Sequence, residues 1–231
     1  MSFCLNFFVF SITVHLMKLV AILLDVSYEY FLNKFAKNIA SDDGVFFTPK
    51  SLVKIIVNII EPKSGILLDP ACGSGGMFVQ SGDFINQSGM SANSAMTFYG
   101  QEKVEYNAQL CLMNMAVHGL TGVIKSGDEA NSFYHDAHNL DGCCDYVMAN
   151  PPFNVDKVKA ESCESAKRLP FGMPSVNKNK EVGNANYLWI SYFLQLFERK
   201  KVVPVLLWLR LQRTVKVKIG ILEKALLELV L

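Results

Sequence analysis

The stretch from Gly65 to Met77, G-I-L-L-D-P-A-C-G-S-G-G-M, decides the fold class. It begins with a short apolar run that ends in Asp69, and such a run is typical of a buried strand. Glycines follow at positions 73, 75 and 76, where they allow positive φ and a close approach of a ligand to the backbone. The helix expected from about Met77 offers free N–H groups to that turn. The order of strand, glycine turn and helix predicts a nucleotide-type binding loop.

Two other interpretations of this loop are weaker. A dinucleotide-binding loop has the spacing G-x-G-x-x-G, whereas this chain has G-S-G-G preceded by D-P-A-C. A tight turn without a ligand is the second alternative, and the elements described below count against it because several of them agree with a cofactor site.

Strands and helices alternate along the rest of the chain. Further strands are expected at 97–100, near 122–125 and at 145–149, and helices at 25–40, 50–60, 104–117 and 185–197. This alternation predicts an α/β fold with a doubly wound, mostly parallel sheet. Pro49 is expected at the first position of the second of these helices, with Thr48 as its N-cap. The polar, interrupted segment 154–183 is expected to be a loop.

Two of the later strands are followed by acidic residues. Ligands of open α/β sheets bind beyond the carboxyl ends of the strands, so these carboxylates are candidates for a binding site. Glu102 is placed to accept hydrogen bonds from both hydroxyls of a ribose, and Asp128 from the exocyclic amine of an adenine. Taken alone, Glu102 is more typical of a solvated surface charge, and Asp128 is equally typical of a helix cap or a turn.

Asn150-Pro151-Pro152-Phe153 follows the fourth expected strand. The prolines supply fixed carbonyls and no competing N–H donors, and Asn150 supplies a neutral carbonyl acceptor. Acceptors arranged in this way suit a planar NH₂ group, since binding both of its protons exposes the nitrogen lone pair. Phe153 offers a flat face on which a base can stack. The alternative is a structural Pro-Pro turn with a core phenylalanine.

The motifs resemble a known family when they are taken in chain order. They are F-F-T-P, D-P-A-C-G-S-G-G-M, Y-G-Q-E, G-D and N-P-P-F. This order resembles the amino-methyltransferases and, more closely, the methylation subunit of type I restriction–modification systems, over about residues 24–197. The resemblance implies a Rossmann-like class I S-adenosylmethionine-dependent methyltransferase fold and site-specific DNA adenine-N6 methylation.

The resemblance also implies two groups of site residues. The group that holds S-adenosylmethionine comprises Phe47, Thr48, Pro49, Asp69, Gly73, Gly75, Glu102 and Asp128. The group that holds the flipped target adenine comprises Asn150, Pro151, Pro152 and Phe153. On this resemblance the methionine end of the cofactor is expected between the F-T-P residues and the Asp69 loop, its ribose at Glu102 and its adenine at Asp128. Phe47 stands where the family commonly has tyrosine. The implied reaction is direct methyl transfer without a covalent intermediate or a metal.

The charge balance bears on how the protein meets DNA. The chain has 22 basic and 21 acidic residues, a net charge of +1. A protein that binds DNA by itself usually carries a basic excess, so the contacts are either local or supplied by another subunit. The resemblance implies the second: a specificity subunit reads the DNA sequence, and the complex includes two methylation subunits and a restriction subunit for cleavage.

The six cysteines include no C-x-x-C pair, so neither a zinc site nor a redox motif is expected. Scattered cysteines favour a reducing compartment and therefore a cytoplasmic protein.

Three segments are expected: an apolar and helical segment at 1–44, a catalytic core at 45–198 and an atypical tail at 199–231. The first 24 residues carry a single charge, at Lys18. They are long enough for a membrane span but fit a signal peptide poorly, and a buried helix or a mis-called start upstream of Met17 are the alternatives. The tail departs from the family pattern, which indicates a frameshift and a truncated member.

Two competing functions remain open at this point. Methyltransferases that act on ribosomal RNA guanine or protein glutamine share the core and often have N-P-P-Y, but Phe153 and the F-F-T-P element count against them. A remnant that binds the cofactor or a partner without turnover is the other alternative, and the tail is the reason to consider it.

Overall fold

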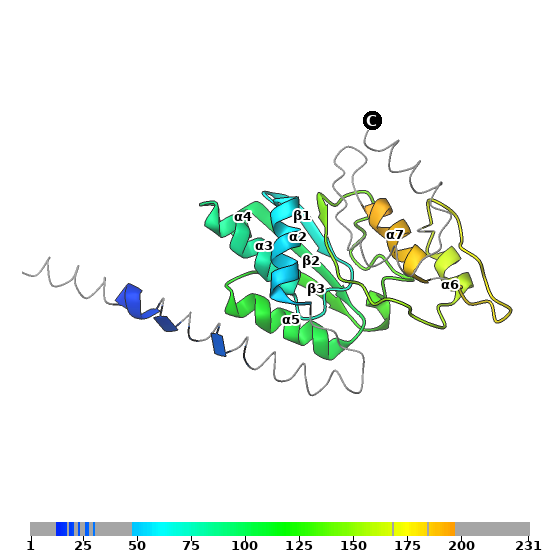
Figure 1. Cartoon of the computed structure of the whole chain (residues 1–231), viewed down its shortest axis with the longest axis horizontal. Coiled ribbons are helices and arrows are strands. Elements are labelled where there is room, and N and C mark those ends of the chain that lie inside the picture. The colour runs from blue at the N-terminus through cyan, green and yellow to red at the C-terminus, as the bar shows by residue number, and fades with distance from the viewer. Residues whose placement is uncertain are drawn as a thin grey trace, which may run out of the picture.

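The computed structural model describes residues 48–167, 169–183 and 185–196, together with helical positions 13–17, 19–20, 23, 26–27 and 30 (Figure 1). The strands are β1 (Gly65–Asp69), β2 (Met96–Glu102), β3 (Gly122–Ser126) and β4 (Tyr146–Val147). The helices are α2 (Lys50–Ile60), α3 (Gly76–Gln87), α4 (Ala92–Ala95), α5 (Glu105–Val117), α6 (Ala160–Ser165) and α7 (Ala185–Leu196), with a 3-10 turn η1 (Asp128–Ala130).

The four strands that the structure describes form one sheet in the order β3-β2-β1-β4, and every pair is parallel. The first strand, β1, lies inside the sheet. β2 and β3 follow on one side of it, and β4 pairs with its other side. The direction of winding therefore reverses between β1 and β4, which is where open α/β sheets bind their ligands. The predicted doubly wound parallel sheet is confirmed.

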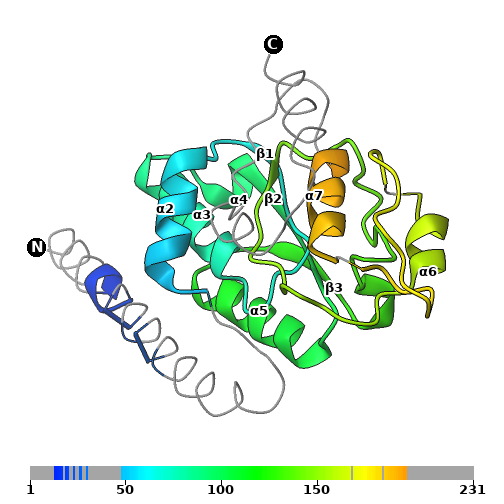
Figure 2. The ribbon, with the colours of Figure 1, turned by 45° about the vertical axis from the view of Figure 1, so that its right-hand side comes forward.

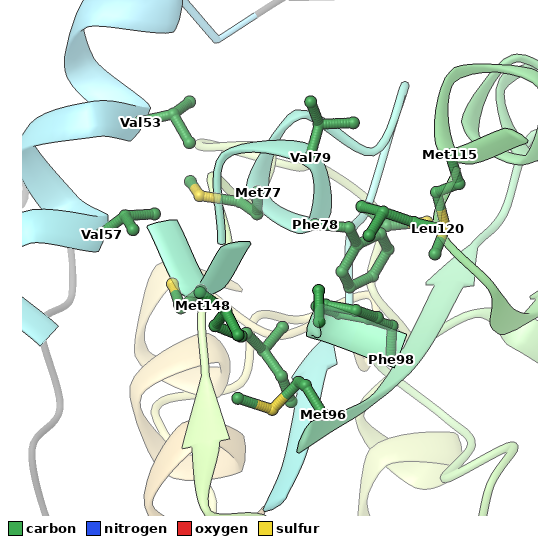
Figure 3. Close-up of a cluster of buried hydrophobic side chains, with 14 of the residues drawn as sticks. Val53, Val57, Met77, Phe78, Val79, Met96, Phe98, Met115, Leu120 and Met148 are labelled. Atoms are coloured by element: carbon green, nitrogen blue, oxygen red, sulfur yellow. The ribbon is translucent and has the colours of Figure 1, made fainter. Parts of the chain in front are cut away.

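Helices cover both faces of the sheet (Figures 1 and 2). Leu67 faces the cluster formed with α2, α3 and α5, whereas Leu68 faces the cluster formed with α7. Neighbouring residues of a strand point to opposite faces, so two adjacent buried leucines require a layer of side chains on each side. Figure 3 shows the first of these clusters, which includes Phe78 and Phe98. The rings of these two residues pack edge to face, with their centroids 5.7 Å apart.

The start of α2 differs from the prediction. Pro49 is the N-cap, with φ −55° and ψ 133°, and no side chain caps the helix. The carbonyl of Pro49 accepts the first helical bonds, from Leu52 N and Val53 N. Thr48 lies one residue outside the helix, and its hydroxyl is used elsewhere in the fold.

The segment 154–183 is more ordered than a loop. It contains α6 and two antiparallel bridges, Lys159↔Glu181 and Val176↔Val182. Apolar residues scattered among the polar ones explain the difference, because Val158, Cys163 and Val182 are all buried in the α7 cluster.

Near the N-terminus, the described positions of the apolar segment are helical. Leu16, Met17, Leu19, Val20 and Leu23 have 48–67% of their surface exposed in this chain. Among the described residues no helix has the length and apolar character needed to cross a bilayer. The tail at 199–231 lies outside the described residues.

Candidate active site

The carboxyl edge of the sheet brings the motifs together. β1 and β2 end at Asp69 and Glu102. Glu102 pairs with Ser126, so Asp128 follows just beyond the neighbouring strand end. On the other side Leu68 pairs with Val147, and Asn150 stands three residues farther along. The parallel register thus gathers residues from four strand ends at one edge, as the sequence predicted.

Asp69 is almost fully buried, with 1% of its surface exposed. Its Oδ1 accepts a hydrogen bond of 2.9 Å from Ala71 N. Burial raises the pKa of Asp69 to about 8. The hydrogen bond from the Ala71 backbone N–H opposes this rise in pKa, and the negative charge of Glu102 adds to it. A buried carboxyl group with such a pKa is stabilised as an anion by an incoming cation, which makes Asp69 a candidate for ligand binding.

Replacing Asp69 by asparagine is expected to stabilise the unliganded chain at pH 8. The folded-state pKa lies above the ordinary value of an aspartate, so between the two pKa values the folded chain holds a proton that the unfolded chain releases. Stability therefore falls as the pH rises from about 4 to 8. Asp69→Asn removes this loss, which is on the order of a few kcal/mol for a buried charge. Thermal unfolding of both proteins at pH 5 and pH 8 measures the effect, and an equal pH dependence in the two would contradict it.

The glycines of the turn have different surroundings. Gly75 has φ 78° and caps α3, and a Cβ there would lie 2.7 Å from the Cys111 sulfur. Gly73 has φ 52°, and a Cβ there would meet no atom within 4 Å. Gly75 is therefore required by the packing of the turn against α5, whereas Gly73 borders open space that a ligand can fill.

Glu102 connects β2 to the glycine turn. Its Oε2 accepts from Gly73 N at 3.0 Å and its Oε1 from Val104 N at 2.9 Å. Burial raises the pKa of Glu102, and the bonds from Val104 and Gly73 oppose the rise. The side chain of Asn107 and the backbone N–H of Lys103 also donate to this carboxylate. A carboxylate offers about four acceptor positions, so a ribose hydroxyl would have to share or replace one of these donors. Asp128, by contrast, is exposed at the start of η1.

Asn150 contacts an element far away in the sequence. Its Nδ2 donates to the hydroxyl of Thr48 at 3.0 Å, across 102 residues. With the NH₂ end of the amide turned to Thr48, the Oδ1 end is the part of Asn150 that can accept from a ligand. The F-T-P element and the N-P-P-F loop therefore share one site. Phe47 lies outside the described residues, and Pro49 is exposed next to Thr48.

The N-P-P-F loop rests on α7, which the motifs did not indicate. The indole N–H of Trp189 donates to the carbonyl of Pro152 at 3.2 Å. Asn186 pairs with Asn154 through two hydrogen bonds, of 2.9 and 3.0 Å. Pro151 is buried, Pro152 is exposed, and Phe153 is half-buried against the α7 cluster. The Pro152 carbonyl already accepts one hydrogen bond from Trp189, so the Pro151 carbonyl is the stronger candidate for the second acceptor beside Asn150.

The fold and the arrangement of the site define the class: this is a Rossmann-like class I S-adenosylmethionine-dependent methyltransferase fold. Similar solved structures agree. A type I restriction–modification methyltransferase subunit from Streptococcus thermophilus has a TM-score of 0.58 and 21% identity over 76% of this chain and 36% of that chain. A putative class I S-adenosylmethionine-dependent methyltransferase from Listeria monocytogenes has a TM-score of 0.57 and 14% identity, over 75% of this chain and 50% of that chain.

The family follows from the sequence match. The N-6 DNA methylase family matches residues 21–209, and the chain belongs to this family. The type I restriction enzyme MjaIX methylase subunit of Methanocaldococcus jannaschii is 40% identical over 171 residues, and the HindI methylase subunit of Haemophilus influenzae is 39% identical over 167 residues. Each match covers 72% of this chain, and the chain spans 29% and 36% of the two relatives. The predicted resemblance is thus confirmed.

Proposed function

We propose that this chain is the catalytic core of a site-specific DNA adenine-N6 methyltransferase that uses S-adenosylmethionine. The single observation that carries the proposal is the bond between Thr48 and Asn150, since it joins the element before the cofactor loop to the N-P-P-F loop. The family match and the 40% identity to a methylase subunit support it. They also favour DNA over RNA or protein glutamine as the substrate.

The residues of the carboxyl edge fit S-adenosylmethionine. The methionine end of this cofactor carries positive charge, and the buried Asp69 offers a carboxylate whose ionised form needs a cation beside it. The open space at Gly73 leaves room for the ligand next to the backbone. We assign the ribose hydroxyls to Glu102 and the adenine amine to Asp128. When bound, S-adenosylmethionine supplies an electrophilic methyl group on a sulfonium sulfur.

The N-P-P-F loop then holds the target adenine. The Oδ1 of Asn150 and the carbonyl of Pro151 accept the two N6 protons, which directs the nitrogen lone pair out of the ring plane. Phe153 provides a stacking surface for the extruded base. These fixed dipoles would stabilise the positive charge that develops on N6 as the bond to the methyl carbon forms and the bond from that carbon to sulfur breaks. The methylated N6 would then release one proton to water, so no residue has to act as a strong base. Thr48 keeps the amide of Asn150 in the orientation that this role requires.

We further propose that the chain works as the modification subunit of a type I restriction–modification complex in the cytoplasm. Its partners are DNA, a specificity subunit and a restriction subunit. The net charge of +1 supports this, because phosphate contacts then come largely from other subunits. The alternative is a truncated remnant that binds cofactor or partner without turnover.

Two measurements, made one after the other, test the proposal. Calorimetry of the purified chain with S-adenosylmethionine is expected to give saturable binding that Asp69→Ala abolishes. Incubation with DNA and the cognate specificity subunit is then expected to produce N6-methyladenine, detected by mass spectrometry. A folded chain that does not bind the cofactor contradicts the proposed function, whereas binding without methylation supports the remnant.

Replacing Thr48 by valine is expected to lower the methylation rate by about tenfold, which corresponds to one hydrogen bond. Valine preserves the shape but cannot accept from Asn150 Nδ2, so the amide is free to turn its NH₂ end to the target base. Thr48→Ser keeps the hydroxyl and serves as the control. Single-turnover methylation of all three proteins measures the effect. Equal rates for valine and serine would show that the bond has no part in catalysis.

A further inference from the structure

Gln101 lies at the end of β2, between Gly100 and Glu102, and has no exposed surface. Its side-chain amide is directed to a segment that follows β3. Nε2 donates within 3.1–3.3 Å to acceptors on Ala130, Ser132 and His135, and Oε1 accepts from Ala137 N at 3.2 Å. One buried side chain thus holds residues 130–137 by both ends of its amide.

Other bonds tie the same segment to the strand ends. The Ser132 hydroxyl donates to the Pro70 carbonyl at 2.5 Å, next to Asp69. His138 Nε2 lies 2.9 Å from the Gly100 carbonyl. The backbone carbonyl of Gln101 accepts from Cys72 N at 3.0 Å, in the glycine turn. Gln101 therefore contacts the glycine turn through its backbone and the segment after Asp128 through its side chain.

Asp128 depends on this arrangement for its position. It is exposed and starts η1, which is only three residues long, so its own helical turn holds it weakly. Gln101 binds Ala130, the last residue of η1, and Ser132, two residues after it. A buried amide costs stability when its partners are lost, so the chain has a strong preference for keeping them in place.

We infer that Gln101 is a positioning residue for recognition of the cofactor's adenine, acting through residues 130–137 on the carboxylate of Asp128. The inference rests on the proposed function, in which Asp128 accepts from the adenine amine. It goes beyond that function because Gln101 is fully buried and therefore is not placed to contact the cofactor itself. Its effect is on selectivity for the base rather than on overall affinity.

The test compares two ligands that differ at this amine. S-adenosylhomocysteine carries the NH₂ group. S-inosylhomocysteine carries a carbonyl oxygen in its place, which has no hydrogen to donate to Asp128. The wild-type chain is expected to bind the first at least about tenfold more tightly, as for a hydrogen bond to a charged group. Gln101→Leu is expected to reduce this preference to less than about threefold, mainly through weaker binding of S-adenosylhomocysteine.

Three further variants keep the result interpretable. Gln80→Leu removes another buried amide, on α3, and is expected to keep the full preference. Gln101→Glu retains the acceptor for Ala137 N but loses the donors, and provides a second variant if leucine prevents folding. In an Asp128→Ala background, Gln101→Leu is expected to change the preference no further.

The outcomes separate the inference from the proposed function. A folded wild-type chain that binds neither ligand contradicts the proposed function and the inference with it. A wild-type chain that binds both ligands equally contradicts the role of Asp128, and the inference then also fails. A preference that survives in the Gln101 variants, or an equal loss of affinity for both ligands, shows that Gln101 has only a structural role.

Discussion

Raising the pH from 6 to 8 is expected to tighten the binding of S-adenosylmethionine by up to about tenfold per pH unit. Burial raises the pKa of Asp69 to about 8, so at pH 6 this carboxyl group is protonated in the unliganded chain. A cationic ligand binds to the ionised form, so a proton must leave Asp69 on binding. The gain ends near pH 8, where Asp69 is half ionised and the α-amino group of the cofactor begins to lose its own proton.

The proton released from Asp69 can be counted directly. Calorimetric titrations at pH 7 in buffers of different ionisation enthalpy give the net number of protons released per cofactor bound. Asp69→Asn is expected to bind at least about a hundredfold more weakly and to release fewer protons, because the neutral amide neither ionises nor pairs with a cation. A wild-type dissociation constant that stays the same from pH 6 to pH 8 would rule out this role for Asp69.

Replacing Asn150 by alanine is expected to reduce the methylation rate by about 10²–10³-fold, the range observed when one preorganised polar group at a reacting centre is removed. Asn150 accepts one N6 proton in the proposed mechanism, and its amide is oriented by Thr48. The affinity for S-adenosylmethionine is expected to stay within about threefold of the wild-type value, because Asn150 acts on the target base.

Single-turnover methylation with the cognate specificity subunit measures this loss, and cofactor binding by the same preparation shows that the variant is folded. Asn58→Ala is the matched control, since Asn58 is an exposed amide on α2. We expect this control to keep the wild-type rate. An Asn150→Ala protein with more than a tenth of the wild-type rate would remove Asn150 from the catalytic group.

The sequence by itself determined the fold class and the identity of most candidate site residues. The apolar strand at Gly65–Asp69, the glycine turn that follows it and the polar residues after the later strands are local features, and local features are readable along the chain. The parallel sheet then brings those strand ends to one edge without further information. Helix boundaries were less certain, because Pro49 proved to be a cap rather than the first helical residue.

Only the tertiary structure decided what each of those residues faces. The bond between Thr48 and Asn150 spans 102 residues, and the support of the N-P-P-F loop by Trp189 spans 37, so no spacing rule could reveal either one. The raised pKa of Asp69 comes mainly from burial, which is a property of everything packed around it. Gln101 belongs to the Y-G-Q-E motif, but the sequence assigned it no role, and the contacts of its amide with residues 130–137 appear only in the fold. Contacts and burial arise when distant segments pack together, and this is why they are absent from the pattern of the chain.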